Sequence, residues 1–220
     1  MSNTSRLLKF ANRYQSLGAI LYVCCIQYYI VQIIVALKWV TPYSLGNNAI
    51  SDLGNTQCGF YGDRFVCSPL HNLMNMSFII LGLLMITGSL LVYQKFHKNL
   101  ITFAAFTLIA IAGAGALLVG AHPENSISHL HLAGAGLSFV MGNVGLVCFG
   151  FAPGIPKTLR MVALISGCMA LVALVLLINH SYFGLGFGGI ERIVAYPQSI
   201  WLIILGLYLL AKREKLPIQM

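Results

Sequence analysis

Residues 100–120 read LITFAAFTLIAIAGAGALLVG and contain no charged side chain. Because about 20 apolar residues in a helix suffice to cross a hydrocarbon core of roughly 30 Å, this stretch predicts a membrane-spanning helix. The mean hydropathy of +0.84 and the 58% hydrophobic content lie outside the range of soluble domains. The sequence therefore predicts an all-α, polytopic membrane protein, a six-transmembrane-helix bundle that forms a single domain over residues 1–220. The spans are placed at about 17–39, 70–93, 100–120, 130–151, 160–178 and 196–211.

Basic residues are distributed unevenly between the two sides of this predicted bundle. Ten of the 13 lysines and arginines precede the first span, follow the last, or lie between spans two and three or four and five. Since cytoplasmic loops are enriched in Lys and Arg, both termini are predicted to be cytoplasmic in a multi-pass protein of the cell membrane. The net charge of +8 then reflects topology and contact with anionic headgroups, and no nucleic-acid partner is expected. The ten residues are Arg6, Lys9, Arg13, Lys95, Lys98, Lys157, Arg160, Lys212, Arg213 and Lys215.

Polar, titratable residues gather at the opposite, extracytoplasmic end. The stretch HPENSISHLH, residues 122–131, contains three of the six histidines together with Glu124. Polar groups lowered into the hydrocarbon need partners or a wet cavity, so an outward-facing polar pocket is predicted. The candidate catalytic residues are Asp52, His71, Glu124 and His131, and the candidate substrate-binding residues are Asn72, Asn75, Glu191 and Arg192. The sequence leaves open whether His180 joins this set.

Two kinds of chemistry remain open for these residues. Imidazole and carboxylate are ligands of zinc and other divalent metals, and His122, His129 and His131 are the candidate metal ligands. Against this, residues 129 and 131 point about 200° apart on a regular helix. Histidine beside a carboxylate also suits acid/base catalysis without a metal, with Ser51 next to Asp52, or Ser68 with His71, as the nucleophile and its partner.

The connection at 179–198 contains four glycines and the pair Glu191 and Arg192. The glycines predict a flexible loop. The charged pair is interpreted as a structural anchor, and Arg192 is alternatively a ligand for the phosphate of a lipid headgroup, which guanidinium binds in bidentate fashion.

Cysteines and small residues give two structural predictions. Cys58 and Cys67 lie in one predicted outer connection, CGFYGDRFVC, in a compartment where disulfides persist, so a bridge between them is expected. GAGA at 113–116 and GAG at 134–136 predict close helix–helix packing.

Four stretches together resemble a known family: NAISDLGN after the first span, SPLHNLMNMSFIILG in the second, HPENSISHLHLAGAGLSF into the fourth, and GGIERIVAYPQSIWLIILGLYLL at the end. They are similar to the bacterial and archaeal membrane family called domain of unknown function 998, from about residue 16 to 211. ISDLG and LHNLMN also look like the wider Frag/DRAM/Sfk group. The resemblance implies a six-helix bundle whose polar residues meet at the extracytoplasmic end, and it suggests a lipid ligand.

Three hypotheses about function follow. The first is a membrane-embedded hydrolase or transferase, with or without a metal, that acts on a lipid or another amphiphile. The second is a non-enzymatic lipid-binding or scaffold protein that uses the same polar residues. The third, a small-molecule or proton-coupled transporter, is disfavoured because the cytoplasmic half carries charges only near helix ends and no inverted repeat is evident. Substrate, reaction and oligomeric state are not given by the sequence.

Overall fold

The computed structural model describes residues 14, 16–61, 64–94, 96 and 99–214. Within these residues, six helices are long and apolar enough to cross a membrane, which confirms the predicted fold. Several basic residues used for the topology prediction, Arg6, Lys9, Arg13, Lys95, Lys98 and Lys215, lie outside the described part. The six spans are Ser16–Leu37, His71–Tyr93, Leu100–Ala121, Ser128–Phe151, Lys157–Ile178 and Gly186–Lys212.

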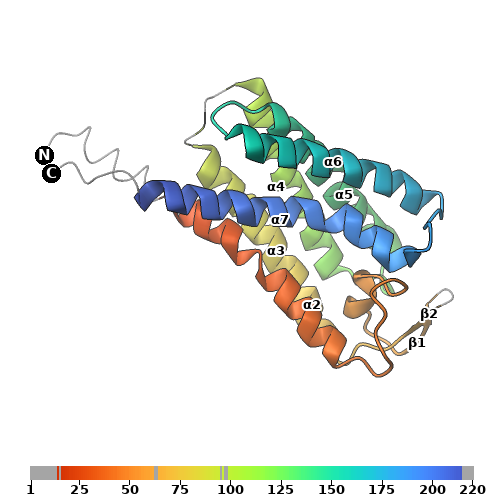
Figure 1. Cartoon of the computed structure of the whole chain (residues 1–220). Helices are drawn as coiled ribbons and strands as arrows, with labels where there is room; N and C mark the ends of the chain where they lie inside the picture. The colour runs from red at the N-terminus through yellow and green to blue at the C-terminus, as the bar shows by residue number, and fades with distance from the viewer. Residues whose placement is uncertain (1–13, 15, 62–63, 95, 97–98, 215–220) are drawn as a thin grey trace, which may run out of the picture.

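Consecutive helices pack side by side through the bundle (Figure 1). Helix α3 (His71–Tyr93) packs on α4 (Leu100–Ala121), α4 on α5 (Ser128–Phe151), α5 on α6 (Lys157–Ile178), and α6 on α7 (Gly186–Glu214). Small residues make two of these contacts very close. A Cβ added to Gly113 would lie 2.7 Å from the carbonyl oxygen of Gly82, and one added to Gly115 would lie 2.5 Å from that of Gly134. The predicted close packing is confirmed at Gly113 and Gly115 of the GAGA stretch and at Gly134 of the GAG stretch.

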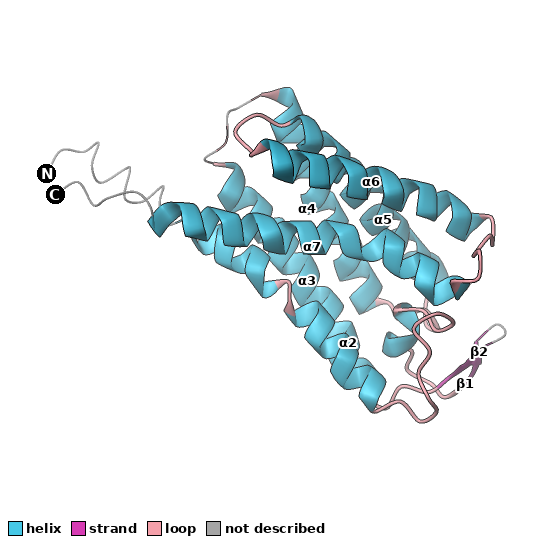
Figure 2. Ribbon diagram, in the orientation of Figure 1, coloured by secondary structure: helices cyan, strands magenta, loops and turns pink. Residues whose placement is uncertain are grey.

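Most of the non-helical structure lies at one end, which we call the polar end. It holds the connection after α2 (Gln27–Leu37), with the 3-10 helix η1 (Ser51–Gly54) and a hairpin of β1 (Gly59–Tyr61) and β2 (Arg64–Val66), and the connections 122–127 and 179–185 (Figure 2). A disulfide joins Cys58 to Cys67 across the base of the hairpin, as predicted. The other end holds the described residues of the short connection that follows α3, and the connection at 152–156.

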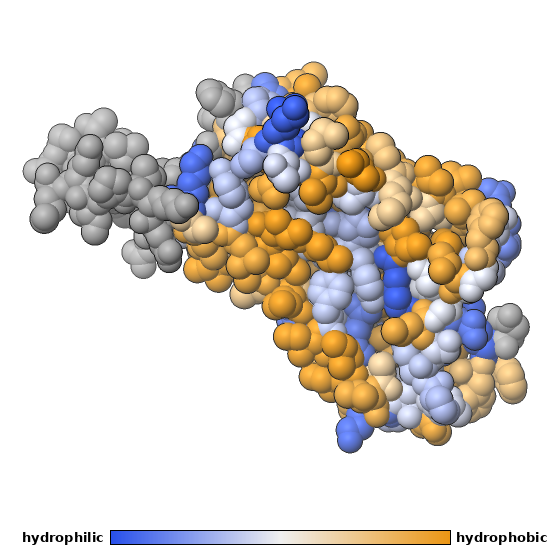
Figure 3. All heavy atoms as spheres, viewed as in Figure 1, coloured by the Kyte–Doolittle hydropathy of each residue, from blue (hydrophilic) through white to orange (hydrophobic). Residues whose placement is uncertain are grey.

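The first span is broken in its middle. Residues 25 and 26 form a turn in which the amide of Cys25 bonds the carbonyl of Tyr22 in i to i−3 fashion, and α2 begins afterwards. Beyond this break α2 packs on α3 and diverges from α7 (Figure 1). Its outer face is apolar and exposed, as expected of a helix in contact with lipid (Figure 3).

The sixth spanning helix begins earlier than expected. Helix α7 starts at Gly186, whereas the sequence predicted a loop to Gln198 and a span from 196. The predicted loop is therefore too long, and Glu191 and Arg192 are helical residues. Glycine is needed here because a Cβ on Gly188 would collide with the carbonyl oxygen of Asn48. Tertiary contact with the connection after α2 thus overrides the weak helix propensity of glycine.

Candidate functional site

Asp52 and Arg64 form an ion pair at the polar end. Asp52 is fully buried in η1, and both of its carboxylate oxygens accept from the guanidinium of Arg64, each at 3.1 Å. The amide of Ala49 and the side chain of Asn48 also donate to it, at 2.8 and 3.3 Å. These hydrogen bonds and the ion pair with Arg64 fix β2 against η1.

Arg192 holds the connection after α2 against the start of α7. Its Nη1 donates to the backbone carbonyls of Leu45, Asn48 and Gly188, each at 2.8 Å, and its Nη2 donates to the Tyr43 hydroxyl. These contacts support the interpretation of Arg192 as an anchor. Its Nη groups are already used, and its buried Nε has no hydrogen-bond partner among the described residues.

Two further contacts position η1. The carboxylate of Glu191 accepts from the amide of Ile50, and the amide nitrogen of Asn75 donates to the carbonyl of Gly54 at 2.8 Å. Both side chains come from spanning helices, α7 and α3 respectively, and both are buried. The backbone of η1, whose first residue is Ser51, is therefore held from two sides.

Glu124 is a second buried carboxyl beside this helix. It is 6% exposed in the connection 122–127 and accepts from the side chain of Asn55 at 3.1 Å. Burial, and then the negative charge and hydrogen bonding of nearby Asp52, raise the pKa of Glu124 to about 8, while a hydrogen bond with Ser51 opposes the shift. Glu124 is accordingly protonated at pH 7, and its carboxyl can donate a proton next to Ser51.

His131 is buried in the first turn of α5, and its hydrogen bonding defines its tautomer. Its Nδ1 lies 2.8 Å from the carbonyl oxygen of His122. A carbonyl only accepts, so Nδ1 carries the proton and donates. In the neutral ring, Nε2 then holds a lone pair and can accept a proton.

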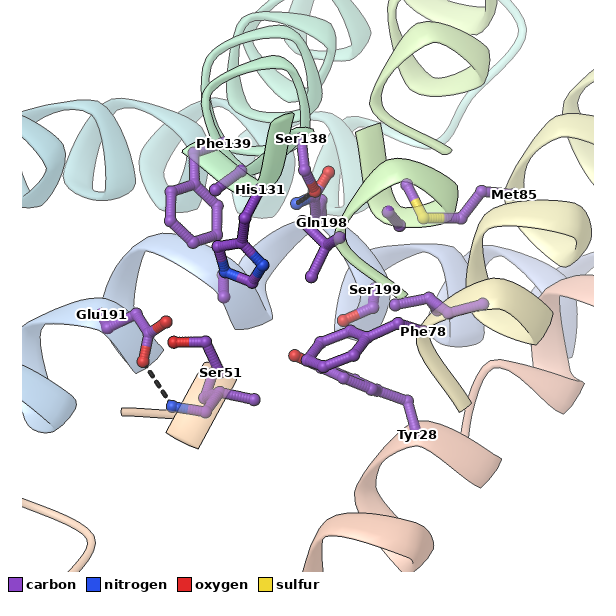
Figure 4. Close-up of a pocket in the computed structure, with 16 residues that line it drawn as sticks. Tyr28, Ser51, Phe78, Met85, His131, Ser138, Phe139, Glu191, Gln198 and Ser199 are labelled. Atoms are coloured by element: carbon purple, nitrogen blue, oxygen red, sulfur yellow. Dashed lines mark hydrogen bonds between the residues drawn. The ribbon is translucent and has the colours of Figure 1, made fainter. Parts of the chain in front are cut away.

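A cavity lies between η1, α5 and α7. Its volume is ≈ 40 Å³. Ser51, His131 and Glu191 line it from η1, α5 and α7 (Figure 4). Its deeper wall is apolar, with Phe78 and Met85 of α3 among the lining residues.

Figure 4 shows the Ser51 hydroxyl directed toward the Glu191 carboxylate, with the His131 ring on the same side of the cavity. Gln198 also lines the cavity, and its buried Oε1 has no hydrogen-bond partner among the residues described. Ser51, His131 and Glu191 therefore present a hydroxyl, a proton acceptor and a carboxylate to the cavity. A cavity with these polar groups and an apolar wall is suited to a ligand that joins a polar reacting group to an apolar part.

The structure brings together only part of the predicted site. Asn72 and His129 are exposed on their helices. His180 is also exposed, and its Nδ1 lies 2.8 Å from the hydroxyl of Tyr182, two residues further on, so it does not join the buried set. The predicted site residues that are buried at the polar end are Asp52, Asn75, Glu124, His131, Glu191 and Arg192.

His71 does not line the cavity. It is the first residue of α3, and its Nδ1 lies 2.8 Å from the carbonyl oxygen of Ser68. The hydroxyl of Ser68 donates instead to the carbonyl of Leu53, at 2.7 Å. The predicted pairing of a Ser68 nucleophile with a His71 base is therefore not formed. The sequence contained Ser51 as a candidate nucleophile but gave no signal that His131, 80 positions later, lies across a cavity from it.

The candidate metal ligands are not gathered into one site. Among the residues that the structure describes, no group of three or more His, Cys, Asp or Glu side chains is arranged to hold a metal ion. His131 uses Nδ1 on the carbonyl of His122, and His129 is exposed on the helix surface. The three histidines His122, His129 and His131 therefore do not converge as the metal hypothesis requires.

The fold and this buried polar end define a polytopic helical protein of the membrane type. The chain belongs to the family described as Protein of unknown function (DUF998), whose sequence model matches residues 22–208. The match covers the helices and the polar end, in agreement with the resemblance found in the sequence. Comparison with curated proteins gives no match, and comparison with solved structures gives none either.

Proposed function

We propose that the protein is a membrane-embedded enzyme that hydrolyses or transfers an acyl group of a lipid or another amphiphile. The observation that carries this proposal is the convergence of Ser51 and His131 on one cavity. The tautomer of His131 leaves Nε2 free to take the proton of the Ser51 hydroxyl. In this role Ser51 is the nucleophile and His131 the general base.

Glu124 and Asp52, which lie near Ser51 but do not line the cavity, have supporting roles in the proposed reaction. Glu124 is protonated at neutral pH, and a carboxyl whose pKa lies near the working pH is suited to donate and recover a proton. Asp52 is held by Arg64 and maintains the raised pKa of Glu124. The apolar wall of the cavity accommodates the hydrocarbon part of an amphiphile next to the reacting carbonyl.

We further propose that the polar end faces outside the cytoplasm. The uneven distribution of basic residues supports this orientation, since ten of 13 fall on the opposite side of the predicted spans. The disulfide between Cys58 and Cys67 supports it independently, because disulfides persist in oxidising compartments. A cysteine introduced at exposed Asn72 should react with a membrane-impermeant maleimide in intact cells, and protection until the cells are opened would contradict the orientation.

An alkyl fluorophosphonate tests the proposed reaction, because it is itself an amphiphile and phosphonylates activated serine hydroxyls. Intact-mass measurement of the purified protein should show one adduct, mapped to Ser51, and Ser51→Ala should remove it. His131→Asn keeps an amide donor for the carbonyl of His122 but removes the base, so labelling should slow by on the order of 10²-fold or more. An unlabelled wild-type protein, or equal rates in wild type and His131→Asn, would overturn the proposal.

A further inference from the structure

A second hollow, distinct from the cavity of Ser51 and His131, lies on the lateral face of the bundle. It is a groove of ≈ 810 Å³ between α2, the residues that follow it, and α7. Its α2 wall includes Ile33, Ala36 and Leu37, and Trp39 also lines it. The break at residues 25–26 produces this groove, because α2 diverges from α7 beyond it (Figure 1).

Two buried hydrogen-bond donors in the groove lack partners. Gln32 and Arg192 line it and are 6% and 8% exposed. Gln32 Nε2 and Arg192 Nε make no hydrogen bond within the described part of the chain. Buried polar groups are rarely left in this state, since each costs the free energy of its lost hydration. Both atoms are donors, so the missing partner is an acceptor.

Hydrogen bonds made by the other polar atoms of Gln32 and Arg192 hold both side chains in place and leave these two donors without a partner. The Oε1 atom of Gln32 accepts from the Tyr196 hydroxyl at 2.8 Å, which fixes the amide and leaves Nε2 on its other side. Nη1 and Nη2 of Arg192 are held by the carbonyls of the connection and by Tyr43. Figure 3 shows hydrophilic surface in the hollow beside the strongly hydrophobic surface of α2.

We infer that this groove binds one phospholipid of the surrounding bilayer, with phosphate oxygens at Gln32 Nε2 and Arg192 Nε and an acyl chain along α2. The cation of Arg192 matches the charge of the phosphate. The volume of the groove lies within the range of small-molecule binding pockets. Gln32 is five positions before the end of α2, so it lies about 8 Å from the helix end, between the bilayer centre and the polar end. This binding is independent of the reaction proposed for Ser51.

Native mass spectrometry of the full chain in detergent, titrated with dioleoyl phosphatidylglycerol, tests the inference. The wild type should retain one tightly bound phospholipid. Gln32→Met removes the free donor at similar volume and should weaken that binding on the order of fivefold, about the effect of one net hydrogen bond. Gln27→Met is the matched control on the same helix, because Gln27 bonds Ser77 and does not line the groove.

Two further variants separate the groove from general effects on folding. Ile33→Trp narrows the groove and should reduce binding, whereas Ile165→Trp, at a position on α6 with nearly the same exposure (62% against 61%), should not. Equal binding by Gln32→Met and wild type, equal binding of dioleoylglycerol, which lacks the phosphate, or a dimer in place of a lipid adduct would overturn the inference.

Discussion

Replacing Glu124 by Gln should change how the stability of the protein depends on pH. The carboxyl is buried beside Asp52, and its pKa is raised from 4.5 to about 8. A raised carboxyl pKa means that the folded state favours the neutral form. The neutral Glu124 carboxyl therefore makes its full contribution to the stability of the folded protein below pH 4.5. That contribution is lost as the pH rises through about 8, because the buried carboxyl then ionises.

The size of the effect follows from this shift. One pKa unit corresponds to about 1.4 kcal/mol, so full ionisation of Glu124 costs on the order of a few kcal/mol of folding free energy. The amide that replaces the carboxyl cannot ionise, yet its oxygen still accepts from Asn55. The wild type should lose about 5–10 °C more in Tm between about pH 5 and pH 9 than Glu124→Gln does.

Thermal unfolding in detergent micelles, followed by circular dichroism at several pH values, measures this difference. Asn125→Ala is a suitable control, because Asn125 bonds Thr56 in the same region but carries no titratable group. It should keep the pH slope of the wild type. Parallel pH profiles for wild type and Glu124→Gln would contradict this prediction, because they would show that Glu124 does not titrate within the folded protein.

Three other substitutions test the packing and the anchors. Gly113→Ala should destabilise the bundle by about 1–3 kcal/mol, because its Cβ meets a backbone carbonyl of α3 at 2.7 Å, whereas Gly136→Ala, with open space around it, should be neutral in thermal unfolding. Removing the disulfide by Cys58→Ser should cost about 3 kcal/mol, given the separation of nine residues to Cys67, and proteolysis should then cut the hairpin faster. Arg192→Lys should lower Tm in the same assay, because an ammonium cannot reach the same three carbonyls and a hydroxyl together.

Hydropathy alone was sufficient to predict the six spanning helices, because each must be apolar over about 20 residues. The glycines of 113–116 also indicated close packing, since only small residues permit it. The start of α7 was not predictable in this way. Gly188 looks like a loop residue until its approach to the carbonyl of Asn48 is known.

The sequence predicted which types of residue form the candidate site, but it did not predict which of these residues lie next to one another. Polar residues at helix ends indicated a polar end, and the structure buries Glu124 and His131 there. Which serine faces which histidine depends on contacts between residues far apart in sequence. His71 illustrates the limit, because its place one turn after Ser68 suggested a pair, and its ring contacts the backbone carbonyl of Ser68 instead.

The proposed function requires that Ser51 and His131 form one reactive site inside the membrane-spanning bundle. The decisive measurement is an experimental structure of the protein after treatment with the alkyl fluorophosphonate. We predict continuous density from the Ser51 hydroxyl oxygen into the cavity, with the His131 ring on its opposite wall and the alkyl chain among the apolar residues of α3. Density on another residue, or a Ser51 side chain directed away from His131, would contradict this prediction.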